Sequence, residues 1–508
     1  MTIQTLIPIL SLFPFRLKNR LLLRADGNPR IGLGHVMRLL ALAEILQGRF
    51  HSVFVIQEPD AAVRELLLAT CDEVVEMPPM PAGGEPAWLC QHALQPTDVL
   101  VLDGYDFELT YQQAVRPAVH KLVCLDDLHA FPSLADLVLN PAGGVTEAAY
   151  ELRQPGARLL AGPAYAPLRA AFREAAALPP ATADTGTVLL CLGGADPTHQ
   201  TQRAATRLLL LPSVRQVHAV VGSAYDQWES LQQWADDQPR LLLHRNLPAP
   251  ALRDLMRQCG TAVCSPSTIS YEYCAAGGGL LFLLPTATNQ HDLDRYLRGA
   301  GLALPYLSVG NVLTSPEADR IAEQLREAQH QHFDGHAPQR LRQEFAALLL
   351  PALPLRLRPI VATDSDQLLA WANEPAVRQY SFIPTPITRE DHERWFANRL
   401  QDEDTLLLLA EDETTYESAG LIRFIVEDDT ALLSYLLAAT HRGRGLAAGL
   451  LVAGVRALFQ QFPEVRRVEG QVMAANVASV RAFERAGFTR QTVKNSSNEN
   501  YTFTWHIS

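Results

Sequence analysis

Short apolar runs alternate with helical segments along most of the chain, and they do so in two successive series. Apolar runs of the first series lie at residues 21–24, 52–56, 99–102, 122–125 and 137–139. Segments with helical spacing lie between them, at 35–46, 61–69 and 108–118. Runs of the second series lie at 187–192, 218–221, 241–244, 261–264 and 280–284. Strands that alternate with helices form a parallel sheet, so we predict two Rossmann-like α/β lobes in tandem with a ligand cleft between them.

The pattern changes after residue 328. Residues 329–353 look like a helix that ends near prolines, and further strands are expected at 406–410, 420–426 and 432–437. A chain of 508 residues is too long for one hydrophobic core. We therefore predict five parts: an extension at 1–19, lobes at 20–175 and 176–328, a helix and linker at 329–354, and a separate α/β domain at 355–508.

Charge and cysteine usage exclude several classes of protein. The formal net charge of −12 argues against nucleic-acid binding, which needs clustered positive charge. The seven cysteines form no CxxC pair and have no ligand-like spacing with histidines, so we expect neither a metal nor disulfides, and a reducing cytoplasm as the compartment. The apolar start is interrupted by Pro8 and Pro14, so we expect no signal peptide and no membrane insertion. The oligomeric state stays open.

A glycine-rich loop follows the last strand expected in the C-terminal domain. Backbone N–H groups at the start of the next helix, 448–459, carry partial positive charge, and glycines let phosphates approach the main chain. The segment consists of Leu436 and Leu437, then Arg442, Gly443, Arg444, Gly445, Leu446 and Ala447. Another helix begins at Asn476-x-x-Ser479 and ends at Glu484-Arg485-Ala486-Gly487-Phe488.

These elements together resemble the GNAT acetyltransferases, over residues 355 to about 506. The resemblance implies acetyl-CoA as co-substrate, bound by the loop residues named above, by Leu436 and Leu437, and by Asn476. Many members carry a tyrosine before the Glu-Arg/Lys-x-Gly-Phe element, where it can protonate the leaving thiolate. This chain has Phe483 there, which cannot donate a proton. Tyr435 or a water is the alternative acid, although Tyr435 is equally consistent with a residue of the strand core.

A second glycine turn lies near the start of the first lobe. Arg24-Ala25-Asp26 precedes Gly32-Leu33-Gly34-His35, and Arg38 follows one turn later. A strand, a glycine turn and a helix start form an anion site. Because imidazole titrates near neutral pH, His35 is a candidate general base. The alternative is a histidine that only packs against the turn.

Further motifs follow in order along both lobes. They are Asp103-Gly104-Tyr105, Leu125-Asp126-Asp127-Leu128, Gly193-Gly194-Ala195-Asp196-Pro197, Ser267-Thr268-x-x-x-Glu272 and Asn289-Gln290. With the glycine turn at His35, they resemble the UDP-sugar hydrolases of pseudaminic acid biosynthesis, over residues 20 to about 310. That resemblance implies a glycosyltransferase-B-like fold related to the MurG transferases.

The resemblance also assigns roles to residues. His35 would activate water against the anomeric carbon, and Tyr105 and Asn289 would position the sugar or the water. UDP-sugar contacts would come from Asp26, Gly32, Gly34, Arg38, Gly193, Gly194, Ser267, Thr268, Glu272 and Gln290.

This chain departs from the hydrolase family at two places. Pro266 stands where glycines usually precede the Ser/Thr pair, and Gly104 replaces a bulkier polar residue. We interpret Asp126 and Asp127 as a solvated turn pair rather than a catalytic dyad. Tyr165 and Arg169 suit packing and ligand contact equally well.

The two resemblances together predict a bifunctional nucleotide-sugar enzyme. The C-terminal domain would acetylate the C4 amine of UDP-4-amino-4,6-dideoxy-N-acetyl-β-L-altrosamine. The N-terminal lobes would hydrolyse UDP-2,4-diacetamido-2,4,6-trideoxy-β-L-altropyranose to the free sugar and UDP. Two alternatives remain for the lobes: a true sugar transferase, or a non-catalytic module that binds the UDP-sugar. A role in flagellin glycosylation follows from the family alone.

Overall fold

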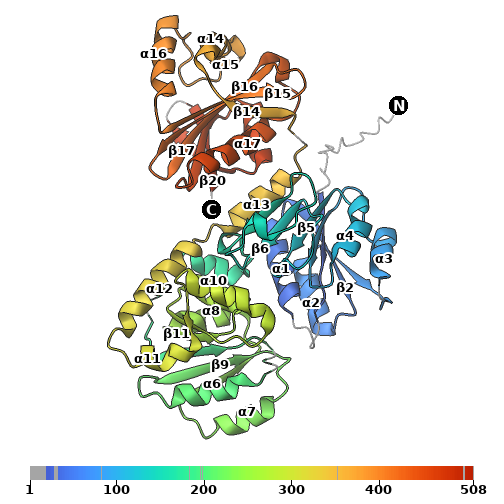
Figure 1. The fold of residues 1–508 in the computed structure, drawn as a ribbon, viewed down its shortest axis with the longest axis vertical. Coiled ribbons are helices and arrows are strands. Elements are labelled where there is room, and N and C mark those ends of the chain that lie inside the picture. The colour runs from blue at the N-terminus through green and yellow to red at the C-terminus, as the bar shows by residue number, and fades with distance from the viewer. Residues whose placement is uncertain are drawn as a thin grey trace, which may run out of the picture.

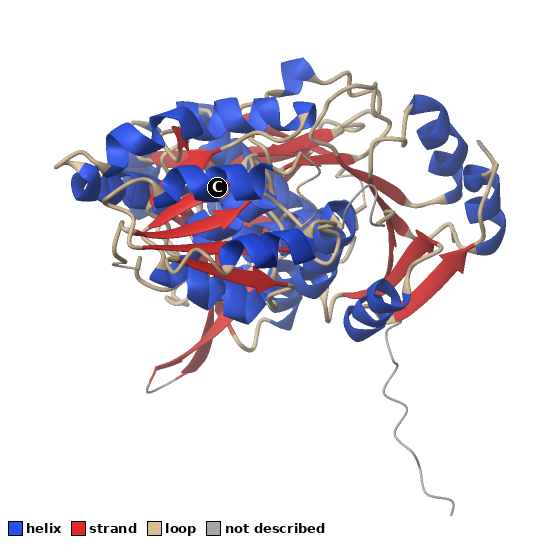
Figure 2. Ribbon diagram, turned by 90° about the horizontal axis from the view of Figure 1, so that it is seen from below, coloured by secondary structure: helices blue, strands red, loops and turns tan. Residues whose placement is uncertain are grey.

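The structure is a computed structural model that describes residues 19–27, 33–81, 83–181, 183–194, 196, 198–351, 353–495 and 498–506. Gly32, Ala195, Pro197 and the extension at 1–18 lie outside the described residues. Three sheets organise the described chain, and the third lies at one end of the molecule (Figure 1). Helices flank the strands in each part (Figure 2).

The first sheet has seven parallel strands in the order β3-β2-β1-β4-β5-β6-β7. These strands are β1 Asn19–Arg24, β2 Phe50–Gln57, β3 Glu73–Met77, β4 Val99–Asp103, β5 Lys121–Leu125, β6 Leu137–Asn140 and β7 Arg158–Ala161. Their helices are α1 Gly34–Leu46, α2 Ala61–Thr70, α3 Glu85–His92 and α4 Leu109–Val115, whereas α5 Ala170–Ala176 packs in the core of the second lobe. The central strands are near-continuous apolar runs because helices cover both faces of the sheet.

The second sheet is also parallel, in the order β10-β9-β8-β11-β12-β13. Its strands are β8 Thr187–Cys191, β9 Gln216–Val221, β10 Leu241–Arg245, β11 Thr261–Cys264, β12 Leu280–Leu283 and β13 Leu304–Pro305. Its helices are α6 Gln200–Leu209, α7 Trp228–Ala235, α8 Ala249–Gln258, α9 Thr268–Ala276, α10 His291–Gly299, α11 Val309–Leu313 and α12 Ala318–His332. In both sheets the chain order reverses beside the first strand, and such a reversal leaves a crevice at the carboxyl ends of the strands.

The third sheet is antiparallel except where β17 pairs with β18, in the order β14-β15-β16-β17-β18-β20-β19. Its strands are β14 Leu355–Pro359, β15 Thr405–Asp412, β16 Ser418–Glu427, β17 Thr430–Leu437, β18 Arg467–Met473, β19 Thr489–Asn495 and β20 Asn498–His506. Its helices are α14 Ser365–Ala372, α15 Pro375–Arg378, α16 Arg389–Leu400, α17 Leu446–Gln461 and α18 Val477–Ala486. The main core packs on the α17 face, and a smaller core with α14 and α16 packs on the opposite face.

The connection between the second and third sheets differs from the single helix expected over 329–353. The chain forms α12 and a separate α13, Ala337–Leu348, because Gly335 adopts a left-handed φ of +77° between them. Phe345 of α13 is buried in the core of the first lobe. On its other side, α13 approaches Gly487 so closely that a Cβ there would lie 3.0 Å from the Cα of Gln343. The helix therefore packs against both parts rather than acting as a loose linker (Figure 1).

A pair of histidines marks this junction and predicts a pH dependence. The rings of His336 and His506 stack with their centroids 4.1 Å apart. Burial, with the charges of His336 and Arg340, lowers the pKa of His506 to about 4. The pKa of an unfolded histidine is about 6.5, so the stability that neutral His506 contributes is complete above that pH and is lost as pH falls toward 4.

We therefore expect the thermal unfolding midpoint to fall between pH 7 and pH 4.5, and to fall less in His506→Gln. Differential scanning calorimetry at several pH values measures this difference. His120 is exposed on the first lobe, so His120→Gln is the matched control and should keep the wild-type pH dependence. An identical pH dependence in His506→Gln and the wild type would contradict the prediction.

Three observations bear on the expected class of protein. All seven cysteines are free thiols. Within the described residues, no three His, Cys, Asp or Glu side chains gather as a metal site requires. None of the helices in the described part of the chain is both long and apolar enough to cross a membrane.

Candidate active sites

A cavity of about 230 Å³ lies between the two parallel-sheet lobes, and both lobes line it. The first lobe contributes Gly34, His35, Arg38, Tyr105, Asp127, Pro141, Ala142, Ala166, Pro167 and Leu168. The second lobe contributes Pro266, Ser267, Thr268, Tyr271, Asn289, Gln290 and Leu293. The cavity meets the first turns of both α1 and α9, so two positive helix ends point toward one space.

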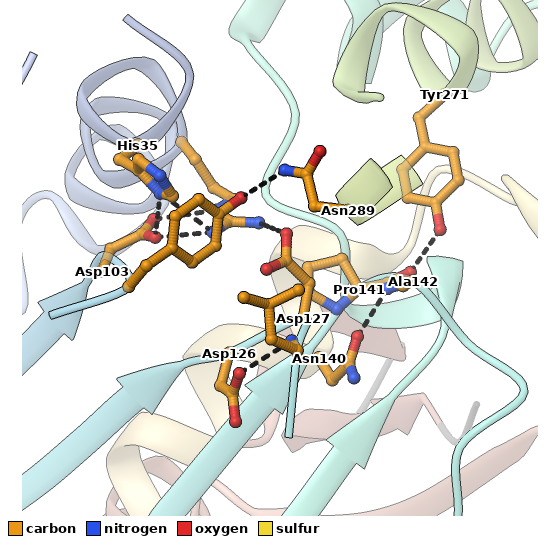
Figure 3. A network of polar contacts seen from close by, with 12 residues as sticks. His35, Asp103, Asp126, Asp127, Asn140, Pro141, Ala142, Tyr271 and Asn289 are labelled. Atoms are coloured by element: carbon orange, nitrogen blue, oxygen red, sulfur yellow. Dashed lines mark hydrogen bonds and ion pairs between the residues drawn. The ribbon is translucent and has the colours of Figure 1, made fainter. Parts of the chain in front are cut away.

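His35 is held by a buried carboxylate. The Nδ1 of His35 lies 2.7 Å from Oδ1 of Asp103, the last residue of β4 (Figure 3). Arg38 binds the same carboxylate through Nε at 2.8 Å and Nη2 at 2.5 Å, and reaches Oδ2 of Asp127 at 3.2 Å. One turn of α1 separates His35 from Arg38, so both side chains point toward the end of β4.

The charges in this network determine which nitrogen of His35 is free. Burial raises the pKa of Asp103, but the charge and hydrogen bonds of Arg38 outweigh it and hold that pKa below its usual value. An ionised carboxylate only accepts hydrogen bonds, so Nδ1 of His35 carries the proton. The longer 3.4 Å contact from Arg38 to Nδ1 is weaker than the 2.7 Å contact and does not change this assignment. The Nε2 of His35 therefore keeps a lone pair with which it can accept a proton.

A hydrogen bond joins the two lobes at the cavity. Asn289 (Figure 3) donates from Nδ2 to the hydroxyl of Tyr105 at 2.8 Å, and the Tyr105 ring meets the His35 ring edge-on with centroids 4.8 Å apart. A second link runs from the hydroxyl of Tyr271 to the carbonyl oxygen of Pro141, at 2.5 Å. The three residues assigned to the reaction, His35, Tyr105 and Asn289, are thus brought to one place although they are far apart in the sequence.

Other residues predicted to bind the UDP-sugar divide into two groups. Gly34, Arg38, Ser267, Thr268 and Gln290 line the cavity. Asp26, Gly193, Gly194 and Glu272 are described, but they do not line it.

Two of the carboxylates outside the cavity are engaged by arginines. The carboxylate of Asp26 binds Arg24, which also binds Glu85. Both oxygens of Glu272 lie 2.6 Å from Arg169, and Glu272 is buried. Each oxygen of Glu272 therefore already accepts one hydrogen bond from Arg169.

The sequence reasoning gave no role to two residues at this site and no separate roles to an adjacent pair of carboxylates. Asp103 was noted as a strand end without a role, and Tyr271 was not singled out. The adjacent carboxylates diverge: Asp126 accepts from the N–H groups of Leu128 and His129, whereas Asp127 faces the cavity and Arg38 (Figure 3). A usable signal existed, because Asp103 ends a strand and Asp127 follows the next one, and both strand ends lie at the carboxyl edge of a parallel sheet.

The second site is a gap in the third sheet. Strands β17 and β18 pair from Thr430 opposite Arg467 to Leu433 opposite Gly470, and their pairing ends there. The β17 main chain at residues 434–437 still pairs with β16, but no strand of the described part of the chain pairs with it on its β18 side. Unpaired backbone N–H and C=O groups at such an edge can bind an extended amide-bearing chain.

The glycine loop lies directly after this gap. Gly443 and Gly445 have left-handed φ values of +74° and +78°, and Gly445 is the N-cap residue of α17. Among the described residues, no atom lies within 4 Å of the position that a Cβ would take at either glycine, so the main chain is open to a ligand. Arg442 bonds Leu437 O at 2.8 Å and pairs with Glu374 at 2.6 Å, which braces the loop.

The predicted proton donor lies beside this gap. The hydroxyl of Tyr435 lies 3.1 Å from Oγ of Ser479, whose backbone N–H donates to the side chain of Asn476 at the start of α18. Burial raises the pKa of Tyr435, against the opposing hydrogen bond from Ser479, so the phenol keeps its proton at neutral pH. Phe483 is buried among aromatic rings, including that of Phe503, and supplies packing alone.

Comparison with known proteins covers both halves of the chain. An uncharacterized protein of Methanocaldococcus jannaschii is 21% identical over 500 residues, which cover 93% of this chain and 97% of the relative. Solved structures resemble the C-terminal part. An aminoglycoside acetyltransferase with coenzyme A is 23% identical and covers 30% of this chain and 94% of its own, with a TM-score of 0.27. A spermidine N-acetyltransferase of Vibrio cholerae is 19% identical and covers 30% and 95%, with a TM-score of 0.27.

A family model identifies the C-terminal part. Residues 354–489 match the acetyltransferase (GNAT) domain, a range that contains the gap beside β17, the glycine loop and α18. Residues 354–489 of this chain thus form a GNAT acetyltransferase domain, and acetyl-CoA is its co-substrate.

Proposed function

We propose that the protein performs two consecutive steps on one nucleotide sugar. The GNAT domain acetylates the C4 amine of UDP-4-amino-4,6-dideoxy-N-acetyl-β-L-altrosamine. The two N-terminal lobes, at residues 20–175 and 176–328, have a glycosyltransferase-B-like arrangement and hydrolyse the acetylated product to 2,4-diacetamido-2,4,6-trideoxy-L-altrose and UDP. The observation that carries the proposal is the histidine–carboxylate pair His35–Asp103 in a cavity that both lobes line.

In the hydrolytic step, Nε2 of His35 takes a proton from water. The water oxygen forms a bond to the anomeric carbon as the C1–O bond breaks, and UDP leaves with the electron pair, so the configuration at C1 inverts. Asp103 holds the imidazole in the required tautomer and stabilises the imidazolium that forms. The first turn of α9, with Ser267 and Thr268 at the cavity, supports binding of the diphosphate.

In the acetylation step, the neutral C4 amine attacks the thioester carbon of acetyl-CoA. The C–S bond breaks, coenzyme A leaves as the thiolate, and the proton lost by the amine passes to solvent water. The hydroxyl of Tyr435 is the donor available to the thiolate. Backbone groups at 434–437 bind the pantetheine, and the N–H groups at the start of α17 bind its diphosphate.

The test supplies the 4-amino UDP-sugar in H₂¹⁸O, with and without acetyl-CoA. We expect UDP release to depend on prior acetylation, and we expect ¹⁸O to appear in the sugar and not in UDP, because water attacks carbon and not phosphorus. Mass spectrometry of both products after rapid quenching measures this distribution. Release that requires an added acceptor sugar would instead indicate a transferase, and tight binding without turnover would indicate a binding module.

A further inference from the structure

Arg423 is a partly buried arginine without an anionic partner. It lies on β16, and no carboxylate in the described part of the chain is within ion-pair distance of it. Its guanidinium also donates none of the hydrogen bonds found among the described residues. Burial, together with the charge of Arg399, lowers the pKa of Arg423. This environment therefore disfavours the charged form of Arg423. A guanidinium nevertheless stays charged in proteins.

Several other arginines that lie inside this protein are neutralised by carboxylates, whereas Arg257 and Arg342 bind backbone carbonyl oxygens instead. Arg24 and Arg38 each bind two carboxylates, and Arg169 binds both oxygens of Glu272. Within the GNAT domain itself, Arg358 binds Asp364 and Glu411. A buried charge without a partner is costly, so Arg423 marks a place where an anion would offset that cost.

The surroundings of Arg423 fit an anionic ligand. The guanidinium carbon lies 5.5 Å from the centroid of the Trp395 ring on α16, so an indole face orients one side of the group. Arg399 adds positive charge nearby, although Asp402 partly neutralises it. The nitrogens of Arg423 remain free to form the paired hydrogen bonds with which a guanidinium binds phosphate.

The register of the sheet places this arginine near the acetyl-transfer gap. Arg423 lies directly opposite Ser434 of β17, so both side chains emerge on the face that α16 only partly covers. Ser434 and its same-face neighbour Leu432 are exposed. The unpaired edge of β17 begins at Ser434, and adjacent strands are about 4.8 Å apart. The distance from Arg423 to the gap is thus between one and two strand spacings. This distance is similar to the one between the C4 nitrogen of a hexose and a phosphate on its C1.

We infer that Arg423 and Trp395 form a binding site for the phosphate groups of the acetyl acceptor. The acceptor is therefore recognised by its sugar amine at the gap and by its nucleotide diphosphate at Arg423. This inference rests on the proposed function, because it requires that acetylation take place while the sugar is still attached to UDP.

The test measures coenzyme A release by the full-length protein in a His35→Ala background, so that hydrolysis does not consume the product. Two acceptors are compared: the 4-amino UDP-sugar and the methyl glycoside of the same amino sugar. We expect Arg423→Ala to raise KM for the UDP-sugar roughly tenfold to a hundredfold, the range for losing hydrogen bonds to a charged group. KM for acetyl-CoA and the rate with the methyl glycoside should not change. Arg423→Lys, which keeps the charge but loses the planar fork, should fall between.

The matched control is Arg394→Ala, which removes an exposed arginine from the same helix as Trp395. It should behave as the parent protein. Equal losses with both acceptors in Arg423→Ala, or a raised KM for acetyl-CoA, would assign Arg423 a structural role and overturn the inference. Equal kcat/KM of the parent for both acceptors would overturn the inference while leaving amine acetylation intact. If neither acceptor is acetylated, the proposed acceptor is wrong and the inference falls with it.

Discussion

His35→Ala is expected to abolish UDP release from the preacetylated UDP-sugar while acetyl transfer by the GNAT domain continues at the wild-type rate. Positioned general bases contribute about 10²–10⁴-fold to rate, so a loss of that size is expected in kcat. Binding of UDP should change little, because the diphosphate contacts proposed at Ser267 and Thr268 are untouched. A coupled assay for UDP and a thiol assay for coenzyme A measure the two activities in one sample.

Two further variants test the role of Asp103. Asp103→Asn keeps the shape of the side chain but removes the charge that holds His35 Nδ1 protonated, so a large loss of hydrolysis is expected with no loss of acetylation. His120→Ala changes an exposed histidine of the same lobe and should leave both activities intact. Unchanged UDP release in His35→Ala would show that the assigned base is wrong.

Gly445→Val is expected to abolish acetyl-CoA binding while hydrolysis of the preacetylated substrate survives. Gly445 has φ +78°, where a side chain with a branched Cβ is strained by roughly 1–2 kcal/mol or more. A valine side chain would also occupy the open space before α17 through which the diphosphate must approach the N–H groups. Isothermal titration with acetyl-CoA should show no binding, and the UDP-release assay should remain near the wild-type rate.

A control separates backbone strain from loss of the site. Gly156 has a similar φ of +72° with equally open surroundings, but it lies in the loop before β7, far along the chain from the GNAT domain. Gly156→Val should therefore carry a comparable strain and retain acetyl-CoA binding. Acetyl-CoA binding by Gly445→Val with wild-type affinity would contradict the assigned role of the loop. Loss of both activities in Gly445→Val would show that the two parts depend on each other, as the packing of α13 against both would allow.

The central strands of the two parallel sheets were predicted from the sequence more accurately than most edge strands. The central strands β1, β4, β8 and β11 are apolar runs, and each was predicted at nearly its observed place. Several edge strands were missed, although β10, at the edge of the second sheet, was predicted at 241–244. Strand β3, for example, lies at the edge of the first sheet, where charged side chains such as Glu73 and Glu76 are common. The break between α12 and α13 was also missed, because the sequence alone does not show that Gly335 adopts a left-handed conformation.

The site residues also divide into those that local sequence patterns predicted and those that only long-range contacts brought together. The glycine loop at 442–447 and the turn before His35 were recognisable because a glycine turn before a helix start is built from residues adjacent in sequence. The Asp103–His35 pair spans 68 positions and the Asn289–Tyr105 bond spans 184, so no local pattern encodes either contact. Asp126 and Asp127 look alike in the sequence, yet only the direction of each side chain tells which of them meets the cavity.

The sequence by itself determined the α/β class, the parallel lobes and the glycine loop before α17, because each depends on hydrogen bonding and periodicity among near neighbours. The tertiary structure decided which carboxylate orients His35 and which residues of the two lobes face one cavity. It also left Arg423 without an ion pair among the described residues. Those depend on the order of strands within a sheet and on the packing of one lobe against another, which bring together side chains that the sequence separates by tens to hundreds of residues.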